Sequence, residues 1–288
     1  MTIDRVGFIG LGAMGSRMAT NLVAAGFGLV GFDTAGTAER LPPGAVAANS
    51  AKDVGAAAEL VLLSLPDGAA SAAVAAELVE SRPRRVRTVV DTSTIGVAAA
   101  QQIHGPLHGA GLGYIDAPVS GGVAGAANAT IALMFSGSAE DLERLRPVLG
   151  AISKRCFHVG TEPGQGQAMK LLNNYLSAVA LTATSEAVSF GLTQGLDMKM
   201  MLDVLNASSG QNTATSDKFP NRILPGLYNA QFVNTLLLKD LTLYGENVVA
   251  AGTANRLGQV VLEIWRRFAT AEPGADFTRI FPFVRDKR

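Results

Sequence analysis

The chain has 288 residues, and its 24 Lys and Arg residues balance 24 Asp and Glu residues. This length predicts a well-buried core and two domains rather than one. A net charge of zero gives no support for nucleic acid or an anionic membrane surface as a partner, so we expect a small molecule. The single cysteine, Cys156, excludes an internal disulfide and fits a reduced, cytoplasmic setting. No apolar segment reaches membrane-spanning length without interruption, and residues 176–192 are expected to form a buried core helix.

Three glycines follow the first apolar run of the chain. Residues 5–9 predict a strand, and an amphipathic stretch at 16–25 predicts a helix after Gly10, Gly12 and Gly15. Gly10 permits the tight turn, Gly12 lets a pyrophosphate approach the backbone, and Gly15 lets the helix pack closely. The helix N-terminus then faces the phosphates. The sequence therefore predicts a dinucleotide-binding loop, which is completed by Leu11, Ala13 and Met14.

An acidic residue ends the second predicted strand. Residues 28–32 run into Asp33, roughly 20 positions past the glycines, where a carboxylate can accept hydrogen bonds from both adenosine ribose hydroxyls of NAD. In the alternative interpretation, Asp33 caps a turn with Thr34 and Gly36. A 2′-phosphate would meet the carboxylate with like charge, and no arginine follows immediately. NAD is therefore favoured over NADP.

The rhythm of the chain changes near residue 163. Up to about residue 160, Ala-rich helical stretches alternate with short β-rich runs, at 61–65, 88–91, 113–117, 131–136 and 157–159. This alternation predicts an α/β, Rossmann-like, doubly wound parallel sheet over residues 1–163. The remainder, 164–288, is predicted to be an all-α domain for substrate binding and oligomerisation. Its apolar content exceeds what one protomer is expected to bury, which predicts a homo-oligomer.

Ligands in open α/β sheets bind at the carboxyl ends of the strands. The loop at residues 65–67 follows one predicted strand and the loop at 91–94 follows the next. Either loop can lie along a dinucleotide, with the Thr94 hydroxyl near the nicotinamide ribose or amide. Helix capping by Ser93 or Thr94 explains the second loop equally well.

A third loop, residues 116–123, combines a proline, a hydroxyl and two glycines. The Ser120 hydroxyl and the backbone amides of Gly121 and Gly122 can form a nest that binds a carboxylate. Ser-Gly-Gly is also common in ordinary turns.

Two polar residues share one face of the helix predicted after residue 164. Lys170 and Asn174 are four positions apart, so their side chains point at the same place. A half-buried lysine loses hydration of its charged form, and its pKa falls towards the range useful for general acid/base catalysis. In the alternative, Lys170 is a surface lysine. The apolar neighbours argue against that alternative: Met169, Leu171, Leu172, Tyr175 and Leu176.

Other polar groups give less information. Lys239 and Asp240 end an apolar run and are expected to form an ion pair at a helix surface. The three histidines have no partners at the spacing of a hydrolytic triad. The carboxylates lack metal-ligand spacing, so no metal site is expected.

Four ordered motifs together resemble the β-hydroxyacid dehydrogenase family. This family includes 3-hydroxyisobutyrate dehydrogenase and tartronate semialdehyde reductase, and it is related to 6-phosphogluconate dehydrogenase. The resemblance covers essentially the whole chain, and its motifs lie at residues 8–15, 116–126, 164–174 and 239–241.

The resemblance implies roles for particular residues. Lys170 would be the general acid/base, and Asn174 with Ser120, Gly121 and Gly122 would hold the substrate carboxylate. Lys239 would lie near the nicotinamide half of the cofactor, while Leu65, Pro66 and Thr94 would line the dinucleotide. The implied reaction is hydride transfer between a nicotinamide cofactor and a small 3-hydroxy acid or its semialdehyde. The implied assembly is a homodimer or homotetramer.

The chain departs from the family pattern at two places. Ala129 stands where the family usually has glycine, and this is expected to alter the loop on the substrate side. Many relatives have Asn-Arg-Thr after the second strand, which suits NADP, whereas Asp33 and Thr34 stand here and favour NAD. Two alternative functions are an imine reductase of the same superfamily, which usually lacks the lysine, and a non-catalytic NAD sensor.

Overall fold

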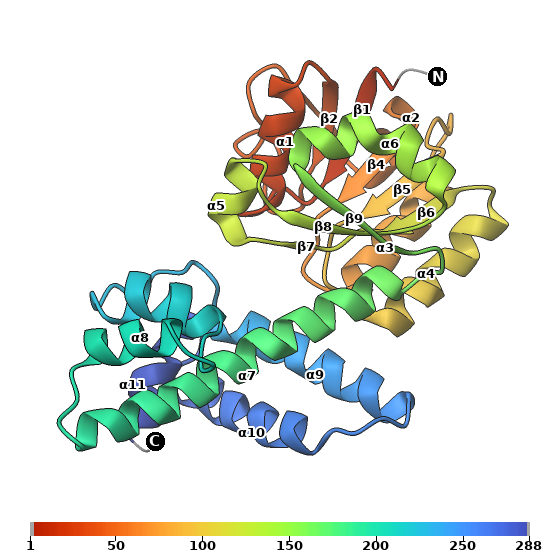
Figure 1. Ribbon diagram of the computed structural model, residues 1–288. Helices are drawn as coiled ribbons and strands as arrows, with labels where there is room; N and C mark the ends of the chain where they lie inside the picture. The colour runs from red at the N-terminus through yellow and green to blue at the C-terminus, as the bar shows by residue number, and fades with distance from the viewer. Residues whose placement is uncertain (1–2, 287–288) are drawn as a thin grey trace. The chain divides into compact units, whose positions relative to one another are not determined.

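A computed structural model describes residues 3–286 (Figure 1). Its contacts divide the chain into two compact units, Met1–Lys170 and Leu171–Arg288. From the sequence, the division was predicted near residue 163. Because the two units are separately compact, each is described by itself.

Unit 1 is built on a sheet in the order β3-β2-β1-β4-β5-β6-β8-β7, with β9 beside β8. The strands from β3 to β6 are parallel. Their carboxyl ends therefore meet at one edge, where the predicted binding loops lie. The strands are β1 (Arg5–Ile9), β2 (Gly28–Phe32), β3 (Val46–Ala47), β4 (Leu60–Leu63), β5 (Thr88–Asp91), β6 (Gly113–Asp116), β7 (Val119–Ser120), β8 (Ala132–Ser136) and β9 (Arg155–Gly160).

Helices cover both faces of this sheet, as a doubly wound fold requires (Figure 1). The helices are α1 (Gly15–Ala24), α2 (Ala51–Ala57), α3 (Gly68–Val79), α4 (Val97–Gly109), α5 (Gly122–Ala127) and α6 (Ala139–Ile152). Alternate strand residues point to opposite faces, so Phe8 packs with α1, α5 and α6, while Ile9 packs with α2, α3 and α4. The Rossmann-like prediction is confirmed.

Two strands run against the predicted direction, β8 and β9, which are parallel to each other. β8 is antiparallel to both β6 and β7, although the sequence rhythm predicted a parallel sheet. The only helix between β6 and β8 is α5, which has six residues. A helix of that length spans about 9 Å, whereas a five-residue strand spans about 17 Å. The chain therefore does not return to the starting edge of the sheet, and β8 runs back beside β6.

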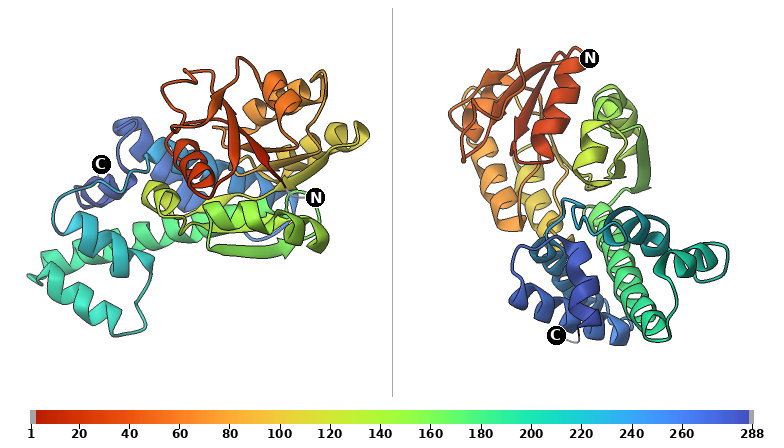
Figure 2. Two further views of the ribbon diagram at one scale, coloured as in Figure 1. Left: turned by 90° about the horizontal axis from the view of Figure 1, so that it is seen from above. Right: turned by 90° about the vertical axis from the view of Figure 1, so that its left-hand side faces the viewer.

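Unit 2 is helical, as predicted. Figure 2 shows α7 (Gln165–Thr193), most of which lies in this unit, as one continuous helix. The buried Trp265 donates a 2.9 Å hydrogen bond from Nε1 to Thr182 Oγ1 and so joins the last long helix to α7. The other elements are α8 (Met198–Asn206), the π-helix η1 (Ala214–Ile223), α9 (Asn234–Ala250), α10 (Arg256–Ala271), the 3₁₀ turn η2 (Phe277–Arg279) and α11 (Ile280–Arg285).

The prediction that residues 176–192 form a buried core helix is wrong along one side of α7. Leu181 and Val188 are buried, but Leu176 is 59% exposed and Phe190 is 67% exposed. The sequence is apolar all round the helix, and unit 2 covers only part of that surface. No helix within residues 3–286 is both long and apolar enough to cross a membrane.

Candidate active site

The loop after β1 has the geometry that its glycines predicted. Gly10 has φ +91°, in the left-handed region that favours glycine. A Cβ on Gly15 would overlap the carbonyl oxygen of Gly10, so α1 begins directly against the turn. A Cβ on Gly12 would meet nothing within 4 Å, which leaves open space beside the backbone where a ligand can approach.

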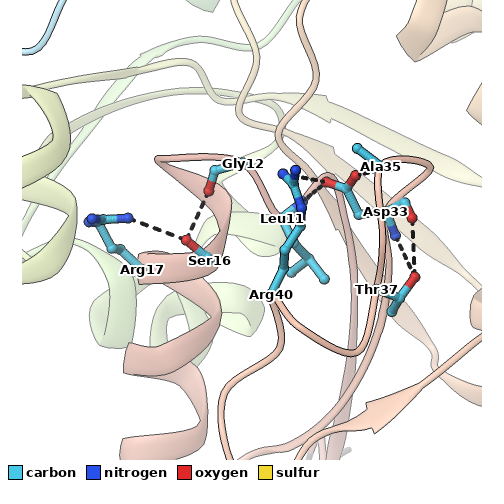
Figure 3. Close-up of polar contacts among 8 residues, drawn as sticks. All are labelled: Leu11, Gly12, Ser16, Arg17, Asp33, Ala35, Thr37 and Arg40. Carbon is cyan, nitrogen blue, oxygen red and sulfur yellow. Dashed lines mark hydrogen bonds and ion pairs between the residues drawn. The ribbon is translucent and has the colours of Figure 1, made fainter.

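The N-terminus of α1 is suited to an anion. Its first turn has no acidic residue and no side-chain cap. Ser16 Oγ donates a 2.9 Å hydrogen bond to the Gly12 carbonyl (Figure 3). Arg17 Nη1 donates one of 2.9 Å to the Ala13 carbonyl. The guanidinium adds positive charge beside the positive end of the helix dipole. These residues fit the pyrophosphate of a dinucleotide.

Asp33 is bonded to the glycine loop. Its Oδ2 accepts a 2.7 Å hydrogen bond from the Leu11 amide, and its Oδ1 accepts one of 2.7 Å from the Ala35 amide (Figure 3). The carboxylate therefore caps a turn, as the alternative proposed, and also lies beside the loop. Arg40 Nη1 lies 3.9 Å from Oδ2. Sequence reasoning missed this arginine because it is not adjacent to Asp33 and has no local motif.

The loops after β4 and β5 are joined by Ser93. Its hydroxyl accepts a 2.8 Å hydrogen bond from the Leu65 amide. The N-cap of α4 is Gly96, which makes no side-chain cap, so the prediction that Ser93 or Thr94 caps this helix is wrong. Leu65 and Thr94 therefore lie in loops that are held together at the carboxyl edge of the sheet.

Buried carboxylates end two neighbouring strands, Asp91 in β5 and Asp116 in β6. Asp91 accepts a 2.9 Å hydrogen bond from the Ser93 amide, and burial raises the pKa of its carboxyl. Asp116 accepts hydrogen bonds of 3.0 Å from the Gly164 amide and 2.9 Å from the Gln167 amide. Burial raises the pKa of Asp116 to about 6, although these two amides act in the opposite direction. Neither role was predicted. For Asp116 the reason is that its partners are about 50 residues away in sequence.

The Ser120 loop has the backbone conformation that its glycines allow. Gly121 and Gly122 have φ values of +137° and +66°, and a Cβ on Gly122 would meet nothing within 4 Å. The following helix, α5, is attached to α1, since Asn21 Nδ2 donates a 2.7 Å hydrogen bond to the Ala126 carbonyl. The candidate carboxylate loop is thus connected to the helix of the glycine loop.

Ala129 adopts φ +52° just after α5, where the family usually has glycine. Replacing it with glycine is expected to raise the free energy of unfolding by about 0.5–1 kcal/mol. The left-handed conformation costs an L-residue about 1–2 kcal/mol, and the greater unfolded-state freedom of glycine offsets about half of that. Urea denaturation measures the change. The control is Ala127→Gly within α5, which is expected to destabilise, and an equal loss in both variants would contradict the prediction.

Lys170 and Asn174 are both buried on α7, at 8% and 7% exposure. The alternative of a surface lysine is therefore wrong. In unit 2, Asn174 Nδ2 donates a 2.6 Å hydrogen bond to Asp240 Oδ2, and Lys239 Nζ lies 3.1 Å from Asp240 Oδ1. Asp240 is only 4% exposed, so it does not form the plain surface ion pair that was expected.

A stacked aromatic pair adjoins this cluster. The rings of Tyr175 and Tyr244 are 4.1 Å apart at 7°. Tyr175 follows Asn174 on α7, and Tyr244 lies one turn after Asp240 on α9. The hydrogen bond and the ring stacking therefore lie next to each other and together hold α7 against α9. Within residues 3–286, no group of three or more His, Cys, Asp or Glu side chains could hold a metal ion.

Comparisons with known proteins agree with this geometry. Residues 5–160 match the NAD binding domain of 6-phosphogluconate dehydrogenase, and residues 164–284 match the family described as NAD-binding of NADP-dependent 3-hydroxyisobutyrate dehydrogenase. The chain is thus an NAD(P)-binding oxidoreductase of the hydroxyacid dehydrogenase type.

Its relatives define the family more closely. An NAD-dependent L-serine dehydrogenase of Pseudomonas aeruginosa is 36% identical over 92% of each chain. A probable 3-hydroxyisobutyrate dehydrogenase of Mycobacterium bovis is 34% identical over 97% of each. A solved Mycobacterium tuberculosis 3-hydroxyisobutyrate dehydrogenase with L-serine has a TM-score of 0.92 at 32% identity, covering 99% of this chain and 100% of that one. The chain belongs to the β-hydroxyacid dehydrogenase family.

Proposed function

We propose that this protein is an NAD-dependent dehydrogenase of a small 3-hydroxy acid, or a reductase of the matching semialdehyde, with Lys170 as general acid/base. The observation that carries the proposal is the pair Lys170 and Asn174, which are both buried and one helical turn apart on α7. Water is largely excluded from both side chains, and Asp240 fixes the Asn174 amide.

The proposed mechanism divides the work between binding and proton transfer. The Ser120 hydroxyl, the amides of Gly121 and Gly122, and the Asn174 amide bind the substrate carboxylate and so fix which face of the hydroxyl-bearing carbon reacts. NAD, held by the glycine loop and Asp33, would supply the hydride acceptor for that carbon. In oxidation, neutral Lys170 takes the hydroxyl proton as the hydride leaves. In reduction, the Lys170 ammonium stabilises the developing alkoxide and donates the proton.

We propose NAD rather than NADP as the cofactor. Asp33 places a negative charge beside the glycine loop. This charge would repel a 2′-phosphate, and the carboxylate would accept hydrogen bonds from the ribose hydroxyls of NAD. Leu65, Pro66 and Thr94 are proposed to line the dinucleotide, and Lys239 its nicotinamide half. Arg40 is the cation paired with Asp33, and it is expected to weaken the repulsion rather than reverse it.

The proposed substrates share a carboxylate and a hydroxyl on the third carbon. L-serine and 3-hydroxyisobutyrate, after which relatives are named, both have this arrangement. The test offers the full chain NAD and NADP separately, with L-serine, 3-hydroxyisobutyrate and a sulfonate analogue, at mildly alkaline pH. Rising absorbance of reduced nicotinamide with NAD and a carboxylate is the expected result.

Two other results would overturn the proposal. Reduction of a cyclic imine without turnover of any hydroxy acid or semialdehyde would favour the imine reductase alternative. Tight NAD binding in a titration, with no turnover of any compound, would favour the sensor alternative.

We further propose a homodimer or homotetramer in which residues 164–288, most of which form unit 2, are the oligomerisation domain. Most of the exposed large apolar side chains lie in this unit, among them Leu176, Phe190, Met200 and Val260. Sedimentation equilibrium is expected to give two or four times the chain mass of 29.8 kDa. A species of the single-chain mass at micromolar concentration would contradict the proposal. The cytoplasmic location stays a prediction.

A further inference from the structure

The first turn of α7 is fixed by a carboxylate from another element. Asp116 ends β6, and its two oxygens accept one hydrogen bond each from the amides of Gly164 and Gln167. Amides at a helix start have no partner within the helix, so the carboxylate satisfies two of them. The same helix carries Lys170 one turn further on.

Gln167 connects this turn to the loop after β5. Its side chain is fully buried. Its Oε1 accepts hydrogen bonds of 2.9 Å from the Ile95 amide and 3.2 Å from the Gly96 amide, and its Nε2 donates one of 3.1 Å to the Ser93 carbonyl. These bonds surround Thr94 in the sequence, so the loop proposed to line the dinucleotide is attached to the helix that carries Lys170.

The backbone of α7 packs against the sheet at Gly166 with no side chain of the helix between them. A Cβ on Gly166 would lie 2.7 Å from both Asp116 Oδ2 and the Met134 carbonyl oxygen. The backbone of α7 therefore rests directly on the end of β6 and on the middle of β8. The start of the helix has little room to shift while these contacts persist.

We propose that Asp116 and Gln167 are positioning residues, which hold the first turn of α7 so that Lys170 keeps a fixed place relative to the loops after β5 and β6. The inference rests on the proposed role of Lys170. A helix rises about 4.5 Å over three residues, so a tilt at Gln167 displaces the lysine directly. A displacement of about 1 Å can cost about a hundredfold in rate.

The charge of Asp116 matters for this contact. The ionised carboxylate has an acceptor oxygen for each amide, whereas protonation turns one of the two oxygens into a hydroxyl donor. Burial holds the pKa of Asp116 at about 6, so the group is ionised above this pH and protonated below it. Asp91 on β5 and Tyr114 on β6 interact electrostatically with Asp116. Its register partner on β8 is the neutral Ser136, and α7 carries Lys170 one turn beyond Gln167. The two amides act to lower the pKa of Asp116, so they favour its ionised form, and protonation weakens both hydrogen bonds. Acidification is therefore expected to loosen the start of α7 while Asp116 itself stays buried.

The first experiment is hydrogen exchange on the wild-type protein, read by mass spectrometry over peptides covering residues 161–172. After correction for the chemical exchange rate, protection of this segment is expected to be at least about threefold lower at pH 5 than at pH 7.5. This readout does not depend on activity, so it tests the contact even if the proposed reaction is wrong. Equal protection at both pH values would overturn the role of the Asp116 charge.

The second experiment measures turnover of Asp116→Asn and Gln167→Met with the substrate found in the dehydrogenase assay. The expected result is a kcat about 10- to 100-fold lower, with the Kd for NAD changed less than about threefold. In the reduction direction, where Lys170 acts as the ammonium, the wild-type kcat is expected to fall below about pH 6, and this decline is expected to be absent in Asp116→Asn. The matched controls are Asp203→Asn on α8 and Gln194→Met after α7, both exposed and expected to behave as wild type.

The outcomes separate the two proposals. If Lys170→Ala retains turnover, the proposed function fails, while hydrogen exchange still reports on the contact. If Lys170→Ala abolishes turnover but both positioning variants keep the wild-type kcat and pH profile, the positioning role is wrong. If Asp116→Asn does not fold, the wild-type exchange and the Gln167→Met kinetics decide.

Discussion

Replacing Lys170 with alanine is expected to lower kcat by about 100- to 10,000-fold, the usual contribution of a general acid or base. The reacting oxygen would lose the group that takes or donates its proton, and the buried position offers little bulk water as a substitute. The Kd for NAD is expected to stay within about threefold of wild type. Steady-state kinetics and calorimetric titration measure the two quantities.

Two further variants distinguish proton transfer from charge alone. Lys170→Arg keeps a positive charge but does not deprotonate in proteins, so it is not expected to restore oxidation. Lys199→Ala removes an exposed lysine that pairs with Asp203 on α8, and it is expected to leave kcat unchanged. A Lys170→Ala enzyme with turnover near wild type would remove the lysine from the mechanism.

Alanine at two glycines of the first loop is expected to weaken NAD binding in both cases but to reduce stability at only one of them. Gly15→Ala places a Cβ against the Gly10 carbonyl, which is backbone and cannot rotate away. We expect a loss of about 3 kcal/mol or more in unfolding free energy, at the upper end of overpacking effects, together with loss of NAD binding. Urea denaturation and NAD titration measure these effects.

Gly12→Ala is expected to leave the unfolding free energy within about 1 kcal/mol of wild type, because its Cβ would enter open space. The same methyl group would lie where the pyrophosphate approaches, so the Kd for NAD is expected to rise at least about tenfold, or about 1.4 kcal/mol. Gly105→Ala on α4 also has open space and serves as the control for both measurements. Wild-type NAD affinity in Gly12→Ala would show that the cofactor does not pass this residue.

The parts of the fold that depend on local sequence could be predicted. The first strand, the glycine turn and the helix of Gly15 follow from short-range periodicity and from backbone conformations that few residues adopt. The proximity of Lys170 and Asn174 follows from helical spacing alone. The burial of Lys170 followed from its apolar neighbours, which are also local.

Long-range contacts could not be predicted in the same way. The partners Asn174 and Asp240 are 66 residues apart, and Gln167 is more than 70 residues from the Ser93 loop. No periodicity relates such pairs. The direction of β8 depended on the length of α5, and the exposure of α7 depended on how much of its surface unit 2 covers. The strand direction and the helix exposure both depend on tertiary packing, which the hydrophobic pattern of the sequence does not encode directly.

In the role proposed for Asp33, its hydrogen bonds are expected to make cofactor choice inseparable from the stability of the empty protein. The carboxylate serves two backbone amides before any ribose arrives, so the loop is ordered during folding and little entropy remains to be lost on binding. A substitution that removes the negative charge to admit a 2′-phosphate also leaves the Leu11 or Ala35 amide without its acceptor. Conversion to NADP therefore requires a second change that restores this acceptor, and single substitutions at Asp33 lower stability as they change specificity.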